Sequence, residues 1–330
     1  MNSYREILEN ANDKGVAVGH FNVANPEMLW AVFNSARELN VPVIVGASEG
    51  ERDFWGVGEI VDMVKGMRER YNYPIFINAD HTYSFDRVKE AIDAGFDSVI
   101  FDGAKLSLEE NIKITKQCVK YARSSGGEVL IEAEMGYIGQ SSKVVDELPE
   151  GAQVTLEEAT KPEEAEKFVK ETGIDLFAPS VGNVHGMLRK VHPVKSGKAG
   201  AKQFNRVNNP ELHIDRIKEI KEAVGIPLVL HGGSGIKDSN FTDAIKAGID
   251  IIHISTEMRV AWHEALNKYL KEKPEDLAPY RVLANSRDAV QNVVTGKTTL
   301  PILSNVLIET KKDKVRFVAT DLDIGISCLI

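Results

Sequence analysis

The stretch AGFDSV at residues 94–99 recurs in altered form as TGIDLF at 172–177 and as AGIDII at 247–252. Each copy places a glycine after an amphipathic pattern, where the left-handed cap of a helix belongs, and then leads into a short run of β-favouring residues. One helix-to-strand connection is therefore used repeatedly, which is typical of a chain built from β-strand and α-helix units.

The same alternation of apolar runs and amphipathic stretches continues from about Val16 to about Tyr269. The sequence predicts eight strands, at Val16–Phe21, Pro42–Ala47, Ile75–Ala79, Ser98–Phe101, Val129–Ala133, Leu176–Pro179, Leu228–His231 and Asp250–Ile254. Helical patterns follow them, for example at Pro26–Asn40, Leu108–Ser124, Lys161–Thr172 and Pro210–Val224. Because the strands are too apolar to leave one face in water, the pattern favours a closed parallel (β/α)8 barrel, or TIM barrel, over an open doubly wound sheet.

Composition excludes several classes of protein. The chain has 330 residues and a net charge of −9, which argues against a general nucleic-acid or membrane surface. Its cysteines, Cys118 and Cys328, imply no disulfide framework. The N-terminal segment is polar, and no apolar run is long enough to span a bilayer, so a cytoplasmic location is expected.

Polar residues follow most of the predicted strands, at the ends where barrel enzymes carry their chemistry. They are Asn22, Ser48, Glu49, Asp80, His81, Glu132, Glu134, Asn183, His185, His231, His253, Ser255 and Thr256. A single histidine or aspartate at such a place is more often a structural residue or a helix cap. Three histidines and several carboxylates arriving at one rim favour a functional site.

Three of these histidines could hold a metal. His81, His185 and His231 follow the third, sixth and seventh strands, so they can converge over the barrel mouth. Three imidazoles with an open fourth position are typical of catalytic zinc. The other histidines fit less well, and packing or surface roles are predicted for His20, His192, His213 and His263.

Glycine-bearing turns follow the last three strands. They read NVHGML at 183–188, HGGSGI at 231–236 and HISTEMR at 253–259. Each can be an ordinary tight turn, but glycine also lets backbone N–H groups approach a ligand, and a helix N-terminus favours an anion. Their place near the usual phosphate position of this fold favours phosphate binding.

On these motifs the chain resembles the class II, metal-dependent fructose-1,6-bisphosphate aldolases and the related tagatose-bisphosphate aldolases, over about residues 1–294. The matching motifs are FNVANPE at 21–27, VPVIVGASEG at 41–50, ADH at 79–81, EAEMGYIG at 132–139, APSVGNVHG at 178–186 and LVLHGGSGI at 228–236.

The resemblance implies one catalytic zinc per chain on His81, His185 and His231, with Glu134 able to approach the metal. It implies that Asp80 exchanges a proton with the substrate hydroxyl at the scissile bond. The sugar and its phosphate are then expected on Asn22, Ser48, Gly186, Gly232, Ser234, Ser255 and Thr256. Another divalent ion or an added monovalent cation is compatible with these ligand types, and the family suggests a homodimer or homotetramer.

Three departures from the family pattern concern the substrate. Where the family carries a carboxylate on a mobile loop, this chain has Ser141, Ser142 and Lys143, so an acid/base role passes to Asp146 or Glu147, or is absent. His253 replaces an asparagine that contacts the substrate, and Arg189 stands where a lysine is expected. The surrounding segment, residues 137–159, is predicted to be an active-site lid.

The C-terminal residues differ in character from the barrel. TTLPILSNVLIE at 298–309 and ATDLDIGISC at 319–328 resemble the opening of the bacterial DNA polymerase sliding clamp, the β subunit. The sequence therefore predicts a barrel domain over residues 1–294 and a β-rich fragment over 295–330, joined by fusion and not an independent domain.

Four functions remain open on the sequence. The leading one is a fructose-1,6-bisphosphate aldolase that releases dihydroxyacetone phosphate and glyceraldehyde 3-phosphate. The others are an aldolase for tagatose 1,6-bisphosphate or another phosphorylated ketose, a zinc- and phosphate-binding barrel without catalysis, and a clamp-related interaction protein.

Overall fold

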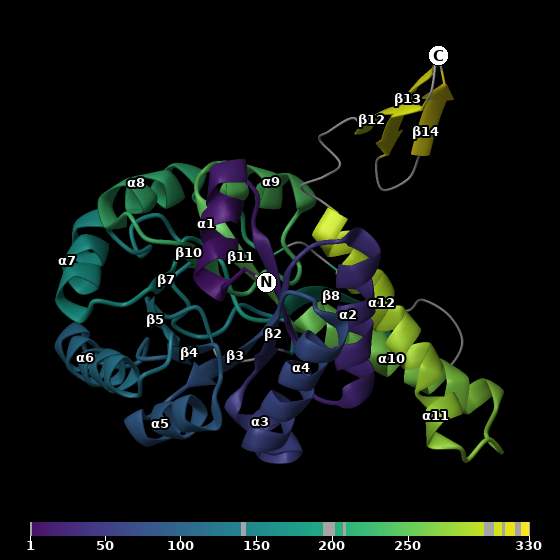
Figure 1. Ribbon diagram of the computed structural model, residues 1–330, viewed down its shortest axis with the longest axis horizontal. Helices are drawn as coiled ribbons and strands as arrows, with labels where there is room; N and C mark the ends of the chain where they lie inside the picture. The colour runs from purple at the N-terminus through teal and green to yellow at the C-terminus, as the bar shows by residue number, and fades with distance from the viewer. Residues whose placement is uncertain are drawn as a thin grey trace.

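Eight parallel strands close into a barrel at the centre of the molecule (Figure 1). The structure is a computed structural model that describes residues 2–139, 143–193, 202–206, 209–299, 307–311, 314–320 and 325–329. The barrel strands are β1 (Val18–Asn22), β2 (Val43–Ala47), β3 (Ile75–Thr82), β4 (Ser98–Phe101), β5 (Leu130–Met135), β7 (Leu176–Pro179), β10 (Leu228–Leu230) and β11 (Ile249–Ile254). The predicted TIM barrel is confirmed, and β3 continues past its predicted end at Ala79 to Thr82.

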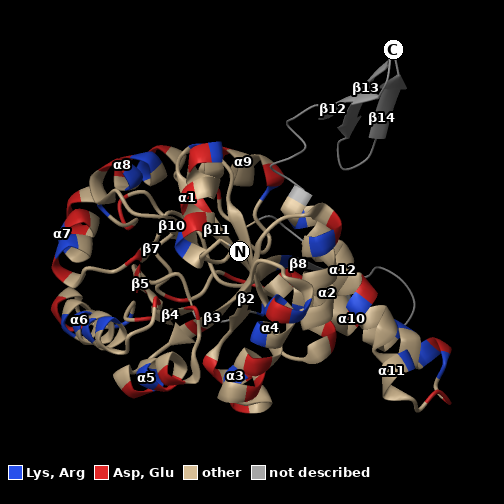
Figure 2. Ribbon diagram, in the orientation of Figure 1, with Lys and Arg blue, Asp and Glu red and all other residues tan. Residues whose placement is uncertain are grey.

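Helices surround the barrel (Figure 1). The main ones are α2 (Pro26–Leu39), α3 (Glu49–Trp55), α4 (Val57–Tyr71), α5 (Phe85–Ala94), α6 (Leu108–Ser124), α7 (Pro162–Thr172), α8 (Ile214–Val224), α9 (Asp238–Lys246) and α10 (Thr256–Glu272). Local sequence sets their starts: Asn25 accepts the backbone N–H of Met28 at 2.9 Å, and Pro26 occupies the first turn of α2. Basic and acidic residues are interspersed along the outer helices (Figure 2).

The barrel interior is apolar near the amino-terminal ends of the strands. Helix α1 (Tyr4–Lys14) covers this end, and Tyr4 stacks on Phe76 with ring centroids 4.8 Å apart. The inward side chains there are Val18, Ile44, Phe76, Leu130, Leu176, Val229 and Ile251. Since side chains on a strand alternate, the residue two positions later points inward as well. Those positions hold polar groups, among them His20, Asn78, Glu132, His231 and His253.

The recurring aspartates of the AGFD-type motifs tie neighbouring strands together. Asp97, Asp175 and Asp250 accept the backbone N–H groups of Ile77, Ile131 and Leu228 at 2.7, 2.9 and 2.8 Å. Basic side chains pair with the same carboxylates, namely Arg68 with Asp97, Arg5 and Arg123 with Asp175, and Lys221 with Asp250. The repeated motif therefore has a structural purpose at the start of three strands.

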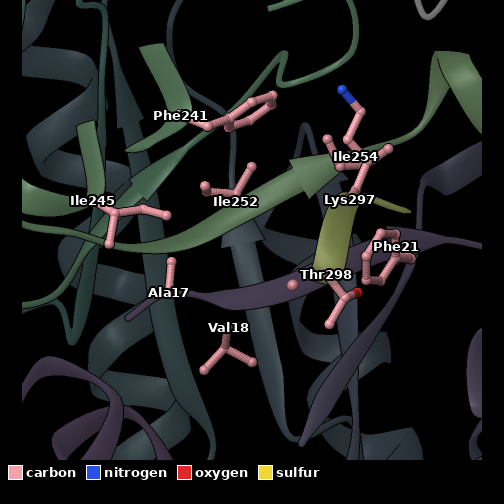
Figure 3. A pocket seen from close by; sticks show the side chains of 10 residues that line it. Ala17, Val18, Phe21, Phe241, Ile245, Ile252, Ile254, Lys297 and Thr298 are labelled. Carbon is pink, nitrogen blue, oxygen red and sulfur yellow. The ribbon is translucent and has the colours of Figure 1, made fainter. Parts of the chain in front are cut away.

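An apolar pocket lies outside the barrel, between strands β1 and β11 and helices α9 and α12 (Ala284–Thr299) (Figure 3). Its walls include Phe21, Phe241, Ile252 and Ile254, with Lys297 at the rim. The Nζ of Lys297 pairs with Glu257 at 3.3 Å and lies 4.9 Å from the ring centroid of Phe241. This lining is unsuited to a sugar phosphate, because it offers apolar surface and a cation that is already paired.

Two smaller sheets and two further helices complete the described residues. One sheet, in the connections beyond β5 and β7, joins β6 (Val144–Val145), β8 (Met187–Pro193) and β9 (Lys202–Arg206). Helix α11 (Pro279–Val282) leads to α12 (Ala284–Thr299), which packs against α2 and α10. The β-rich tail contains β12 (Leu307–Lys311), β13 (Lys314–Thr320) and β14 (Gly325–Leu329), paired antiparallel. Over the described part of the chain, none of the helices has the length and apolar character needed to cross a membrane.

We predict that Asp175→Ala lowers the free energy of unfolding by about 2 kcal/mol, because it leaves the buried N–H of Ile131 without its acceptor. Urea unfolding followed by circular dichroism measures the change. Glu171→Ala is the matched control, since Glu171 forms an exposed pair with Lys116 and its loss should cost under about 0.5 kcal/mol. Equal losses in the two variants would contradict the structural role of Asp175.

Candidate metal and substrate site

Four side chains at the carboxyl ends of the barrel strands form a potential metal-binding group. His81 comes from the end of β3, Glu134 from β5, His185 from the turn after β7, and His231 from the residue after β10. One ligand atom of each lies within 4.8 Å of the others. The structure thus brings together the three histidines and the glutamate that the sequence singled out.

Neighbouring carboxylates fix the tautomers of two of these histidines. His81 Nδ1 lies 2.9 Å from Asp102 Oδ2, and His231 Nε2 lies 2.8 Å from Glu132 Oε1. Because a carboxylate accepts, these ring nitrogens donate, and the opposite nitrogens keep their lone pairs for a cation. Asp102 and Glu132 therefore orient the rings of His81 and His231 from the side away from the potential metal position.

Several polar atoms of the group are buried without a hydrogen-bond partner among the described residues. They are Glu134 Oε2, His185 Nε2 and His231 Nδ1. Leaving such atoms unpaired in the interior costs free energy, and a bound divalent ion satisfies all of them at once. The residues present therefore fit a metal ion.

Burial and neighbouring charges shift the pKa values of these potential metal ligands. Burial, aided by Asp102, raises the pKa of Glu134 well above its ordinary value. Burial, with His81 and His231 nearby, lowers the pKa of His185 well below its ordinary value, so its imidazole is neutral. Burial also works against protonation of His81, but Asp80, Asp102 and Glu134 outweigh it and raise that pKa to about 10. Glu134 and His81 therefore hold protons when no metal is bound, and a metal ion takes the place of these protons at the two ligands.

Asp80 presents one free carboxylate oxygen beside the metal-binding group. Its Oδ2 accepts from Asn22 Nδ2 at 2.8 Å, while its Oδ1 lacks a hydrogen-bond partner in the described chain and lies 3.8 Å from His81 Nε2. Burial favours the neutral acid, but His81, His253 and His20 hold the pKa of Asp80 well below its ordinary value. Asp80 is therefore an ionised group that can take up a proton.

Asn22 and Ser48 share one anchor. Glu51 Oε2 accepts from Asn22 Nδ2 at 3.1 Å and from Ser48 Oγ at 2.8 Å. Its other oxygen pairs with Arg259 at 2.6 Å. The sequence analysis missed Glu51, although the Ser48-to-Glu51 spacing is that of a capping box and marks the start of α3.

The turns after β7 and β10 lie directly against each other. Gly232 has φ +65°, and a Cβ added there would lie 2.2 Å from the backbone oxygen of Val184. Only glycine allows this approach. The two predicted phosphate turns are therefore packed together, with Gly186 and Gly232 in adjoining backbone.

The start of α10 joins the same surface. Ser234 Oγ accepts the backbone N–H groups of Ser255 at 3.3 Å and Glu257 at 3.2 Å. Asn209, which the sequence did not single out, donates from Nδ2 to the carbonyls of Gly186 and Ser234 at 2.8 Å each. Thr256 is buried in the first turn of α10.

The acid/base candidates of the lid segment are placed differently. Asp146 and Glu147 are both exposed, and Arg189 Nε lies 2.8 Å from Asp146 Oδ1. Strand β6 pairs with β8, which ties residues 144–145 to 187–188. Ser141 and Ser142 lie outside the described residues. The buried carboxylates at the strand ends are instead Asp80, Asp102, Glu132 and Glu134.

His20 and His253 form a pair that the sequence analysis did not recognise. The two residues are register partners on β1 and β11, and their rings stack with centroids 3.4 Å apart and planes 3° apart. The sequence predicts a surface or packing role for His20, and its buried, stacked ring fits packing, but the pairing with His253 is not predicted. A signal was present, because His20 lies two residues before Asn22 on one strand and therefore shares its inward face.

The fold and this site define a (β/α)8-barrel enzyme with a metal-binding group at the carboxyl ends of its strands, which is the arrangement of a metal-dependent lyase of the aldolase type. The family model for fructose-bisphosphate aldolase class-II matches residues 2–304, and this chain belongs to that family. A second model, for the N-terminal domain of the DNA polymerase III beta subunit, matches residues 280–330.

Curated relatives and solved structures support the same family. The chain is similar to fructose-bisphosphate aldolase from Geobacillus stearothermophilus, at 38% identity over 299 residues, covering 89% of this chain and 94% of the relative. It is 36% identical over 298 residues to that of Staphylococcus aureus strain Mu50, covering 89% and 95%. The YdjI aldolase of Escherichia coli K12 superposes with a TM-score of 0.71 at 30% identity, covering 90% and 95%.

We predict that His185→Ala removes bound metal, because it deletes one of the three imidazoles in the group of four potential ligands. Elemental analysis of the purified protein measures metal per chain. His263→Ala is the control, since His263 is exposed on α10. Unchanged metal content in His185→Ala would exclude this residue as a ligand.

Proposed function

We propose that this chain reversibly cleaves fructose 1,6-bisphosphate to dihydroxyacetone phosphate and glyceraldehyde 3-phosphate, with one zinc ion per chain on His81, His185 and His231. Glu134 is the carboxylate that approaches the ion. The observation that carries the proposal is the ligand group of these four residues lying next to the free oxygen of Asp80.

The chemistry requires a base and an acceptor for electrons. Cleaving a β-hydroxy ketone removes the proton of the C4 hydroxyl, breaks the C3–C4 bond, and leaves an electron pair on the ketone fragment. Asp80 Oδ1 takes the proton, and Asn22 keeps the carboxylate oriented by donating to Oδ2. Zinc, when bound, supplies a Lewis acid that withdraws electron density from the carbonyl oxygen.

Phosphate recognition falls to the glycine turns and the start of α10. Backbone N–H groups at Gly186 and Gly232, with Ser234, Ser255 and Thr256, can surround an anion without a basic surface. The buried Oγ of Ser255 has no hydrogen-bond partner within the described residues, which suits a hydroxyl that binds a ligand. A local site of this kind is needed in a chain with a net charge of −9.

The remaining assignments follow the family. His253, Arg189 and Ser48 contact the sugar, and Asp146 or Glu147 on the lid segment completes the proton transfers. We propose a homodimer or homotetramer in the cytoplasm, without nucleic-acid or membrane partners, and allow another divalent ion or a monovalent cation in the site. Residues 1–294 form the catalytic barrel domain, and residues 295–330 are a clamp-like addition.

One observation favours a second ketose. His253 Nδ1 lies 3.5 Å from the Asp80 oxygen that takes the proton of the C4 hydroxyl. Fructose and tagatose 1,6-bisphosphate differ in configuration at C4. The residue that replaces the family's asparagine is therefore expected beside the carbon that distinguishes the two sugars. Tagatose 1,6-bisphosphate, or another phosphorylated ketose, is therefore the alternative substrate. A zinc- and phosphate-binding barrel without turnover is the alternative of a different class.

We predict that the purified protein releases dihydroxyacetone phosphate from fructose 1,6-bisphosphate, and that a chelator abolishes the release until zinc is restored. A coupled assay for dihydroxyacetone phosphate measures both results. Release from tagatose 1,6-bisphosphate alone would favour the second ketose. Absence of release from either sugar, with metal still bound, would leave only the non-catalytic barrel.

We predict that Asp80→Ala retains metal but loses roughly 10²–10⁴-fold in kcat, because Asp80 provides the proton acceptor and is not one of the four ligands. Asp53→Ala serves as control, since Asp53 pairs with Arg87 on the exposed surface. Substantial turnover by Asp80→Ala, measured in the same assay, would mean that another group accepts the proton.

A further inference from the structure

A second cluster of unpaired acceptors lies beside the metal-binding group. It consists of His20, Asp80 and His253, which are 1%, 4% and 6% exposed. His20 Nδ1, Asp80 Oδ1 and His253 Nε2 are buried without hydrogen-bond partners in the described chain. One ring nitrogen of each histidine and one carboxylate oxygen of Asp80 lie within 4.8 Å of one another. Such a cluster needs a donor or a cation that comes from outside the chain.

Hydrogen bonds decide which nitrogens are acceptors. Asn78 donates from Nδ2 to Ser98 Oγ at 2.7 Å, so its Oδ1 faces His20 Nε2 at 3.1 Å as an acceptor. His20 therefore carries its proton on Nε2 and leaves Nδ1 bare. No hydrogen bond joins His253 to Asp80, but Nδ1 is the ring nitrogen that faces this carboxylate, at 3.5 Å, which favours the proton on Nδ1 and an acceptor at Nε2.

The geometry of the rings disfavours a second metal ion. The imidazoles of His20 and His253 are parallel, with centroids 3.4 Å apart, and His253 continues the stack onto His231 at 4.2 Å. Stacked parallel rings hold their in-plane lone pairs in two separate parallel planes, so one small ion cannot lie in both. Separate hydroxyl groups can each donate to such a row of acceptors. A polyol therefore fits this cluster better than a cation.

We propose that His253 and His20 together select the configuration at C4 of the ketose 1,6-bisphosphate, with His253 touching the sugar and His20 acting as a positioning residue. The inference rests on the proposed function, in which Asp80 takes the proton of the C4 hydroxyl. His253 occupies one side of the same Asp80 oxygen and offers a bare nitrogen to a sugar hydroxyl. The place of its ring therefore decides from which side the C4 hydroxyl reaches Asp80.

The barrel provides space and an anchor for the positioning ring. A Cβ added to Gly46 would lie 2.1 Å from Cε1 of His20, so the glycine on β2 leaves room for the imidazole. Asn78 Oδ1 accepts from Nε2 of the same ring, and Ser98 Oγ holds the amide of Asn78 in place. With His20 fixed on one face and His231 on the other, the ring of His253 has little freedom to tilt.

The test uses the full-length protein in the condensation direction. Dihydroxyacetone phosphate and D-glyceraldehyde 3-phosphate are combined, and the ratio of the two C4 epimers, fructose and tagatose 1,6-bisphosphate, is measured by ¹³C NMR at early conversion. This ratio does not depend on the fraction of active protein, so a merely structural defect does not move it. Metal content is measured in parallel.

We expect the wild-type protein to make one epimer predominantly. His253→Asn should shift the ratio roughly tenfold towards the other epimer, the scale of one lost hydrogen bond. His20→Gln should shift the ratio in the same direction with metal content unchanged, and the double variant should shift it no further than His253→Asn. Asn78→Ala, which keeps both histidines but frees the ring of His20, should produce a smaller shift of the same sign, and it replaces His20→Gln if that variant does not fold.

The outcomes separate this inference from the proposed function. Active variants at positions 253, 20 and 78 with the wild-type epimer ratio would overturn it while leaving the aldolase standing. Additive shifts in the double variant would show that His20 does not act through His253. A wild-type protein that makes neither epimer would overturn the proposed function, and the inference with it.

Discussion

Burial of several carboxylates at one end of the barrel is the constraint on which the rest of the site depends. Asp80, Asp102, Glu132 and Glu134 are each at most 7% exposed, and like charges in a low-dielectric interior repel strongly. The chain offsets part of this repulsion with imidazoles, since Asp102 and Glu132 each hold a histidine N–H. The unpaired oxygen of Glu134 and the unpaired nitrogens of His185 and His231 remain. A divalent cation is the simplest group that completes this arrangement.

A rigid frame is needed to hold such a cluster, and it is built away from the site. The aspartates at the starts of β4, β7 and β11 accept backbone N–H groups across the barrel wall, at the end opposite the metal-binding group. Helix α1 and the apolar layer above it fill the same end. Fold stability and chemistry are thereby divided between the two ends of the strands, as expected for this fold.

The sequence predicted the barrel and the convergence of the three histidines because both depend on local periodicity and on the common direction of parallel strands. It did not predict the contacts that depend on neighbouring loops and strands. Asn209 lies in the connection before α8 yet braces two turns, and Asp102 orients His81 from the next strand. His20 was missed for a different reason: its strand position was known, but its ring is buried only because β1 and β11 pair in the closed barrel.

The departure from the family pattern at position 253 is consistent with its surroundings. An asparagine at position 253 could donate and accept hydrogen bonds, whereas a histidine whose Nδ1 faces the Asp80 carboxylate at 3.5 Å offers an acceptor at Nε2. The imidazole of His253 also packs best against another flat ring, and the ring of His20 stacks on it with centroids 3.4 Å apart. The two histidines therefore form a matched pair: His20 fills the space next to Gly46, and the ring of His253 stacks between His20 and His231, where a small amide could not stack. We therefore expect this chain to differ from other metal-dependent aldolases in the side chains that line the sugar site. The metal ligands are expected to be the same.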